Sequence, residues 1–247
     1  MPAAAELALR TASVLEVIYL IFNEGYAATA GDDWMRPALC EEALRLGRIL
    51  AGLATDDSEV HGLVSLMEIQ ASRLRARVGP SGEPVLLLDQ DRSRWDPLLI
   101  RRGMVALSRA EVLGNARGGL GPYAVQAAIA ACHARARAPD ETDWPRIVAL
   151  YDALAQIAPS PIIDLNRAVA VAMAFGPAAG LELVDQLTSE PSLAAYHLLP
   201  SVRGDLLEKL GRTEEARGEF SRAAALAGNT RERQLLLQRA TRLHKPV

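Results

Sequence analysis

The chain has 247 residues, of which 50% are hydrophobic and 23% charged, and this balance excludes disordered, collagen-like and coiled-coil chains. Its 27 basic and 30 acidic residues give a net charge of −3, so no nucleic acid is expected to bind this chain directly. Only two cysteines occur, Cys40 and Cys132, which favours a reducing compartment and predicts a cytoplasmic location. The apolar run at 14–22 is too short to span a membrane, so no membrane partner is expected.

We predict four helices in the first part of the chain, at 5–24, 35–53, 57–75 and 95–113. Apolar residues recur there at the spacing of one helix face. Asp57 and Ser58 carry side-chain oxygens that can cap the third helix. Pro97 stands in the first turn of the fourth, where its missing N–H costs no hydrogen bond. The glycine-rich stretch 114–121 lacks the pattern of a phosphate-binding loop and is interpreted as a connecting loop.

The segment 76–90 is the exception to the helical pattern. Two short apolar runs flank a Gly/Pro-rich loop at 79–84, which is typical of a hairpin. The sequence therefore predicts one short β-hairpin near residues 76–88.

We predict seven further helices, at 122–137, 143–158, 161–175, 177–189, 192–210, 212–227 and 230–243. Pro159 and Pro191 each follow the second helix of a pair and are about one tetratricopeptide repeat apart. The last pair carries that repeat's small-large spacing, at Gly204, Leu207, Gly211, Ala216, Phe220 and Ala223. Arg203 and Gly228 depart from it, because the repeat prefers Leu and Pro there. The predicted fold is all-α, a superhelix of helical hairpins, with subdomains at 1–120 and 121–247.

No metal, cofactor or catalytic site is expected. The four histidines, His61, His133, His197 and His244, share no metal-ligand spacing. Glu24 and Asp91 could serve as paired carboxylates, but neither is accompanied by a nucleophile or a histidine. The sequence therefore predicts that the chain is not an enzyme.

Two segments carry more polar and aromatic residues than a simple core needs. One ends the first helix with Asn23, Glu24 and Tyr26; the other runs from 89 to 96. The candidate interaction or clamp residues are Asn23, Glu24, Tyr26, Asp89, Asp91, Arg92, Arg94, Trp95 and Arg167. In one interpretation the arginines and carboxylates clamp the hairpin to the first helices; in the other they line a polar groove for a partner. We favour the clamp, because apolar residues flank the charged run.

Four motifs, in this order along the chain, resemble the C-terminal extension of one group of extracytoplasmic-function RNA polymerase sigma factors. They are VIYLIFNEGY at 17–26, LLLDQDRSRWD at 86–96, GPYAVQAAIAACH at 121–133, and PSP at 159–161 with LNRAVA at 165–170. The resemblance extends from about residue 14 to the end, and Arg167 lies in its last motif.

The resemblance implies a regulatory domain whose partners are the sigma-factor core regions and RNA polymerase. The regions that grip the polymerase and read the promoter are not visible here, so we expect an isolated extension that does not bind promoter DNA. The resemblance assigns no catalytic residue. Two other hypotheses stay open. One is a small-molecule sensor or residual enzyme with a polar pocket near Glu24 and Arg94, and the other is a dimerisation domain. The sequence leaves the oligomeric state undetermined.

Overall fold

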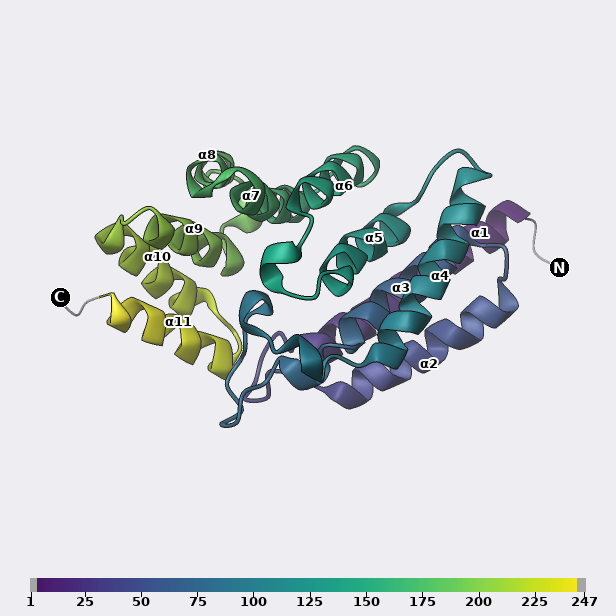
Figure 1. Cartoon of the computed structure of the whole chain (residues 1–247), viewed down its shortest axis with the longest axis horizontal. Coiled ribbons are helices and arrows are strands. Elements are labelled where there is room, and N and C mark those ends of the chain that lie inside the picture. Colours follow the sequence, from purple (N-terminus) through teal and green to yellow (C-terminus); the bar gives the residue numbers. More distant parts are fainter. Residues whose placement is uncertain (1–3, 244–247) are drawn as a thin grey trace. The chain divides into compact units, whose positions relative to one another are not determined.

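The computed structural model describes residues 4–243, and in this part of the chain eleven α-helices follow one another without a β-sheet (Figure 1). This confirms the all-α fold of helical hairpins. The helices are α1 (Ala4–Tyr26), α2 (Pro37–Leu53), α3 (Ser58–Ala71), α4 (Pro97–Asn115), α5 (Pro122–Arg135), α6 (Trp144–Ile157), α7 (Pro161–Phe175), α8 (Pro177–Leu187), α9 (Leu198–Lys209), α10 (Thr213–Leu226) and α11 (Thr230–Arg242).

The chain forms two compact units. The first contains α1 to α5, and the second contains α6 to α11 together with two short earlier segments, Ala30–Trp34 and Pro80–Pro84. The repeat pattern placed the division before α5, at residue 120. In the structure α5 packs on α3 and α4, so it belongs to the first unit.

Helix α3 is the centre of the first unit, and its residues from Gly62 to Ile69 are all buried. It packs against α1, α2, α4 and α5. Gly62 lets α5 approach closely, because a Cβ at this position would lie 2.6 Å from the backbone N of Ala124. Glu59 in the first turn of α3 accepts hydrogen bonds from the N–H groups of Tyr123 (2.8 Å) and Ala124 (3.1 Å). It thereby caps α5, whose own N-cap residue is a glycine.

The predicted hairpin near residues 76–88 is wrong. Within this segment the structure shows short 3-10 turns at Leu74–Ala76 and Leu87–Asp89. A single backbone hydrogen bond, from the N–H of Val85 to the carbonyl of Arg77 (2.8 Å), joins the two sides of the loop. Pro80 and Pro84 lack the N–H that a ladder needs, and an isolated pair of strands is only marginally stable.

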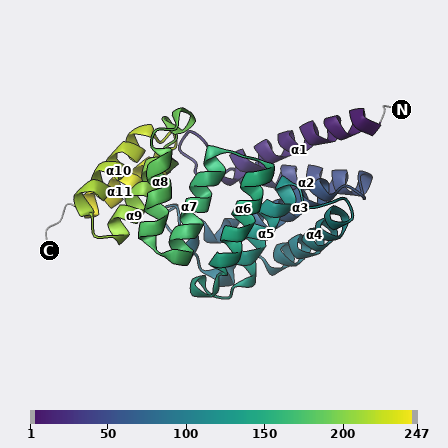
Figure 2. The ribbon, with the colours of Figure 1, turned by 90° about the horizontal axis from the view of Figure 1, so that it is seen from above.

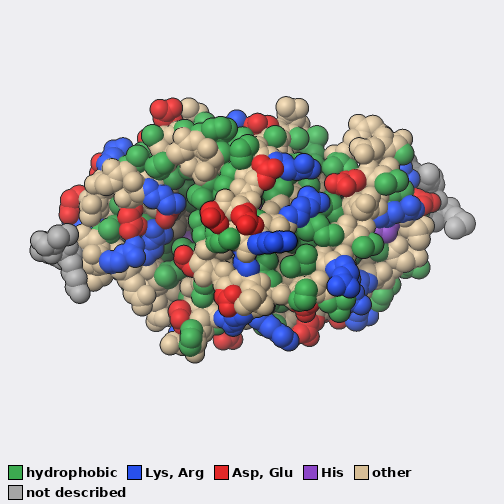
Figure 3. Space-filling view, in the orientation of Figure 1, with side chains coloured by type: hydrophobic (Ala, Val, Ile, Leu, Met, Phe, Trp, Pro, Cys, Tyr) green, Lys and Arg blue, Asp and Glu red, His purple; other side chains and the backbone are tan. Residues whose placement is uncertain are grey.

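The described residues contain no helix that combines the length and apolar character needed to cross a membrane. Acidic and basic side chains are scattered among apolar ones over the face shown in Figure 3. That face carries no extended field of one sign.

The second unit is a row of helices in which each packs against the next along the chain; Figure 2 shows α6 to α9 side by side. Phe220 of α10 is fully buried in its core, as the repeat spacing predicts, together with Leu165, Val184 and Leu207. A Cβ at Gly204 of α9 would lie 2.9 Å from the Phe220 ring. The glycine therefore leaves the space that the ring occupies.

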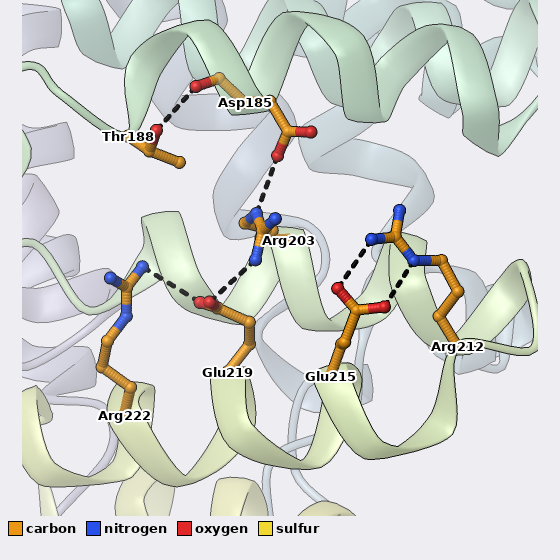
Figure 4. Close-up of polar contacts among 7 residues, drawn as sticks. All are labelled: Asp185, Thr188, Arg203, Arg212, Glu215, Glu219 and Arg222. Atoms are coloured by element: carbon orange, nitrogen blue, oxygen red, sulfur yellow. Dashed lines mark hydrogen bonds and ion pairs between the residues drawn. The ribbon is translucent and has the colours of Figure 1, made fainter.

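Ion pairs also join three helices of this unit (Figure 4). Arg203 of α9 contacts Asp185 of α8 (2.8 Å) and Glu219 of α10 (2.9 Å). Glu219 also pairs with Arg222 at 3.0 Å. Arg203 is one of the two residues that depart from the repeat pattern, and it connects the neighbouring helices by charge where the repeat prefers leucine.

The segment between α1 and α2 completes the second unit through Asn229. This residue is fully buried, and its side-chain oxygen caps α11 by accepting from the N–H of Arg231 (3.0 Å). Its amide donates to the carbonyl of Asp33 (2.9 Å), and Gly31 forms a parallel bridge with Asn229. The side chain of Thr230 donates to Asp32 (2.9 Å).

Candidate functional site

Five residues of the first unit form a cluster of arginines on aromatic rings, which we call the arginine–aromatic cluster: Tyr26, Arg73, Arg77, Arg92 and Trp95. Tyr26 ends α1. Arg73 and Arg77 flank the 3-10 turn that follows α3. Arg92 begins, and Trp95 follows, the 3-10 turn that precedes α4. The bends at the ends of three helices thus bring these side chains together.

The guanidinium groups stack on two rings. Arg77 lies 3.6 Å above the centroid of the Tyr26 ring, and Tyr26 in turn stacks on Phe22. Arg92 lies 5.0 Å from the centroid of Trp95. Arg73 lies between the rings, 5.8 Å from Tyr26 and 5.7 Å from Trp95. Such cation–π contacts contribute about 0.5–2 kcal/mol each, and more where water is excluded.

Two of the arginines also bind the carbonyls at helix ends. Arg92 donates to the carbonyls of His133 (2.7 Å) and Ala136 (2.6 Å) at the end of α5. Arg77 donates to the carbonyl of Tyr26 (3.0 Å) at the end of α1. The last carbonyls of a helix have no N–H group within the helix to bind, so arginine side chains are suitable donors for them.

Arg73 differs from its neighbours. It is only 8% exposed, yet its side chain has no hydrogen bond or ion pair to any described residue, and its Nε is enclosed without a partner. The indole Nε1 of Trp95, a residue that is 5% exposed, is likewise enclosed without a partner. A buried guanidinium without a counter-charge is destabilising, so Arg73 calls for an explanation.

The cluster concentrates positive charge. Burial lowers the pKa of the Arg77 guanidinium, and the neighbouring Arg73 lowers it further. Burial also lowers the pKa of His133 to about 4, with the charges of Arg73 and Arg92 adding to the effect. His133 is therefore neutral at pH 7.

The charged run at 89–96 contains both residues of the arginine–aromatic cluster and exposed residues. Arg92 and Trp95 join the cluster. Arg94 is exposed, and the one hydrogen bond of its side chain to a described residue is a long one to the Val78 carbonyl (3.5 Å). Asp89 and Asp91 are exposed and form no ion pair within the described residues. Arg92 therefore fixes this segment through backbone carbonyls, and no arginine–carboxylate clamp of the predicted kind is present there.

Hydrogen bonds from Ser93 to Asp91, from its hydroxyl (2.7 Å) and its backbone N–H (3.0 Å), hold the pKa of that carboxyl below its usual range. The Asp91 side chain thereby caps the 3-10 turn before α4. This is a local structural role.

The other candidate residues lie outside the cluster. Glu24 pairs with Arg36 (2.7 Å) and accepts from the hydroxyl of Thr29 (3.0 Å), which fixes the turn after α1. Asn23 is half-buried and accepts a backbone hydrogen bond through its carbonyl. Arg167 belongs to the second unit, where it pairs with Asp152. Glu24 and Arg94 do not share a pocket among those found in the described residues.

Arg73 and Arg77 were not among the residues predicted for the site. The sequence pattern assigned Arg73 to a helix ending at 75, whereas α3 ends at Ala71, and the turn that follows directs both arginines to Tyr26. No local pattern marks this early end. The described residues contain no group of His, Cys, Asp or Glu side chains able to hold a metal ion.

A second feature of the first unit is an apolar groove between α1 and α2, of about 440 Å³. It is lined by Ser13, Val14, Val17, Ile18, Leu46, Ile49, Leu50 and Leu53. Ser13 is the one polar residue of this lining. Leu53 is 79% exposed, Val17 55% and Ile49 49%, so the groove presents apolar side chains to solvent.

Residues 10–111 match a family of unknown function (DUF6596), a region that covers most of α1 to α4. Over 231 residues the chain is 46% identical to an uncharacterized protein of Rhizobium meliloti (strain 1021). The match covers 94% of this chain and 53% of that relative. The chain thus spans about half the length of the curated relative it matches.

Proposed function

We propose that this chain is a regulatory protein-interaction module of an extracytoplasmic-function sigma factor, acting in the cytoplasm without a catalytic role. The observation that carries the proposal is the exposed apolar groove between α1 and α2. The four sequence motifs that resemble the sigma-factor extension support it, and the first of them includes Val17 and Ile18 of the groove.

The occupant that we propose for the groove is an amphipathic helix from the sigma-factor core regions. Exposed contiguous apolar surface on a protein marks an interaction site, and a groove between two helices accepts the apolar face of a third. About half of the Rhizobium relative lies outside the match, and that half is long enough to contain such core regions. The net charge of −3 supports a protein partner over a nucleic acid.

The experiment is co-expression of the full chain, carrying an affinity tag, with the part of the Rhizobium relative that it does not match. We expect the two to co-purify. We also expect Ile49→Glu to reduce the recovered partner at least about tenfold, because a charge placed in an apolar contact must be desolvated. Leu237→Glu is the matched control, since Leu237 of α11 is also 49% exposed but lies outside the groove.

The region of the relative that matches this chain serves as a positive control for a folded partner. If that region captures the rest of the relative and this chain does not, the proposal is wrong. Equal loss of partner in both variants would show that the groove is not the docking site. The same partner, added to RNA polymerase, should direct transcription from a promoter, and this chain should change its yield.

A further inference from the structure

Arg73 and Trp95 present two buried hydrogen-bond donors that share no acceptor. The Cζ of Arg73 lies 5.7 Å from the centroid of the Trp95 ring. The Nε of Arg73 and the Nε1 of Trp95 are both enclosed, and neither has a partner among the described residues. Both groups can only donate. No described residue accepts a hydrogen bond from either of these two atoms.

We propose that Arg73 and Trp95 form a binding site for an oxyanion, the carboxylate or phosphate group of a small molecule. A water molecule could accept a hydrogen bond from either donor but would leave the guanidinium charge uncompensated in a low-dielectric setting. An oxyanion supplies both the acceptor and the counter-charge, and the planar guanidinium fork matches the two oxygens of such a group.

The surroundings suit an anion. The ring of Tyr26 also lies near Arg73, with its centroid 5.8 Å from the Cζ of the guanidinium. Contacts with two rings restrict the orientation of this side chain. A cavity of about 560 Å³ lies on the Trp95 side of the pair and is also lined by Arg75, Ser93, Arg94, Asp96 and Pro97, whereas Arg73 does not line it. The side chain of Asp96 in this lining is engaged in capping α4. Arg75 and Arg94 give this cavity a positive charge that attracts anions.

This site goes beyond the proposed function, because it shares no residue with the groove between α1 and α2. Ligand binding and partner docking can therefore be tested separately. A chain that binds oxyanions but no sigma-factor region, or the reverse, would separate the two proposals.

Trp95 itself reports on the site. The full chain contains three tryptophans, and the variant Trp34→Phe/Trp144→Phe leaves Trp95 as the one fluorescent indole. We titrate this variant with sodium phosphate, sodium acetate and sodium chloride at constant ionic strength. We expect a saturable change in Trp95 fluorescence with phosphate, acetate or both, and none with chloride. A response to phosphate alone assigns a phosphate group, and a response to acetate alone assigns a carboxylate.

Arg73→Met in this background removes the charge and keeps the apolar stem. We expect it to weaken binding at least about tenfold, the factor that one hydrogen bond to a charged group contributes. Arg101→Met, at an exposed arginine of α4, is the control and should leave binding unchanged. If circular dichroism shows that Arg73→Met does not fold, Arg73→Lys keeps the charge, loses the fork and should bind several-fold more weakly.

Two results would contradict the proposed oxyanion site. One is the absence of any saturable response up to about 10 mM of either anion, which corresponds to less than about 3 kcal/mol of binding. The other is an equal response in the Arg73 and Arg101 variants, because phosphate also acts on proteins through a general, site-independent effect.

Discussion

Replacing Gly62 by alanine tests whether α3 and α5 approach each other as closely as the structure shows. The added Cβ would lie 2.6 Å from the backbone N of Ala124, 2.8 Å from its Cα and 3.0 Å from its Cβ. Carbon atoms in contact prefer about 3.5–4.0 Å. None of these three atoms can rotate away, so the helices have to separate by about 1 Å.

The magnitude follows from two opposing effects. Overpacking a well-packed core costs about 1–3 kcal/mol, and the backbone neighbours in α5 place Gly62 in the upper half of that range. Alanine also has a higher helix propensity than glycine, which returns about 0.8–1 kcal/mol. We therefore expect Gly62→Ala to lower the free energy of unfolding of the first unit by about 1–2 kcal/mol.

Gly52→Ala is the matched control. Gly52 is also in a helix, α2, but it is exposed, and a Cβ there meets nothing within 4 Å. The same substitution should be stabilising by about 0.5–1 kcal/mol. Urea titrations of both variants in the Trp34→Phe/Trp144→Phe background, followed through Trp95 fluorescence in the first unit, measure the difference. Equal stability of the two variants would refute the close approach of α3 to α5.

Four other predictions concern single side chains. Phe220→Ala should lower the stability of the second unit by about 3–5 kcal/mol, and an unchanged thermal midpoint would exclude the buried position. Arg92→Ala should lower the unfolding free energy by about 1.5–3 kcal/mol, because the carbonyls at the end of α5 lose a charged donor. Arg94→Ala should change it by less than about 0.5 kcal/mol, and urea titration of the two variants tests both values. The pKa of His133, about 4, lies below its ordinary value of about 6.5, so the unfolded chain binds a proton that the folded chain does not. Stability should therefore fall as the pH drops from about 6.5 to 4, by up to about 3 kcal/mol, and His133→Asn should remove this part of the pH dependence.

The helices could be predicted from the sequence because several local signals agree at each of them. Asp57 caps α3 and Asp96 caps α4, and both precede a run of apolar residues at helical spacing. Phe220 is buried as its spacing from Ala216 and Ala223 indicates. Such signals lie within a few residues of each other, so no knowledge of distant neighbours is needed.

The hairpin prediction was wrong because the stability of a strand depends on neighbours that are distant in the sequence. The runs on either side of the loop at 79–84 have strand-like composition, but a strand is stable only beside a further strand or a helix that covers it. Leu86 and Leu88 remain 45% and 36% exposed, so this side of the segment is only partly covered. Its backbone forms 3-10 turns, which satisfy their own hydrogen bonds.

The candidate site could be predicted in part. The dense polar and aromatic run drew attention to Arg92 and Trp95, which do lie in the arginine–aromatic cluster. The same pattern could not tell Arg92 from Arg94, because the direction of each side chain depends on a 3-10 turn whose geometry is set by Asp91 and Ser93. The sequence pattern predicts Arg73 on the polar face of a helix. It is buried because α3 ends earlier, at Ala71.

The hydrogen bond between Asn229 and Asp33 joins residues that are 196 positions apart, so it can form only late in the synthesis of the chain. At ribosomal rates of about 5–20 residues per second, about 10–40 s pass between the emergence of Asp33 and that of Asn229. Throughout this time the segment Ala30–Trp34 lacks its final partner, while the helices on either side of it can already pack with α3. The second unit is thus closed by one of the earliest segments made, and a chain that ends before Asn229 leaves the segment Ala30–Trp34 without this partner.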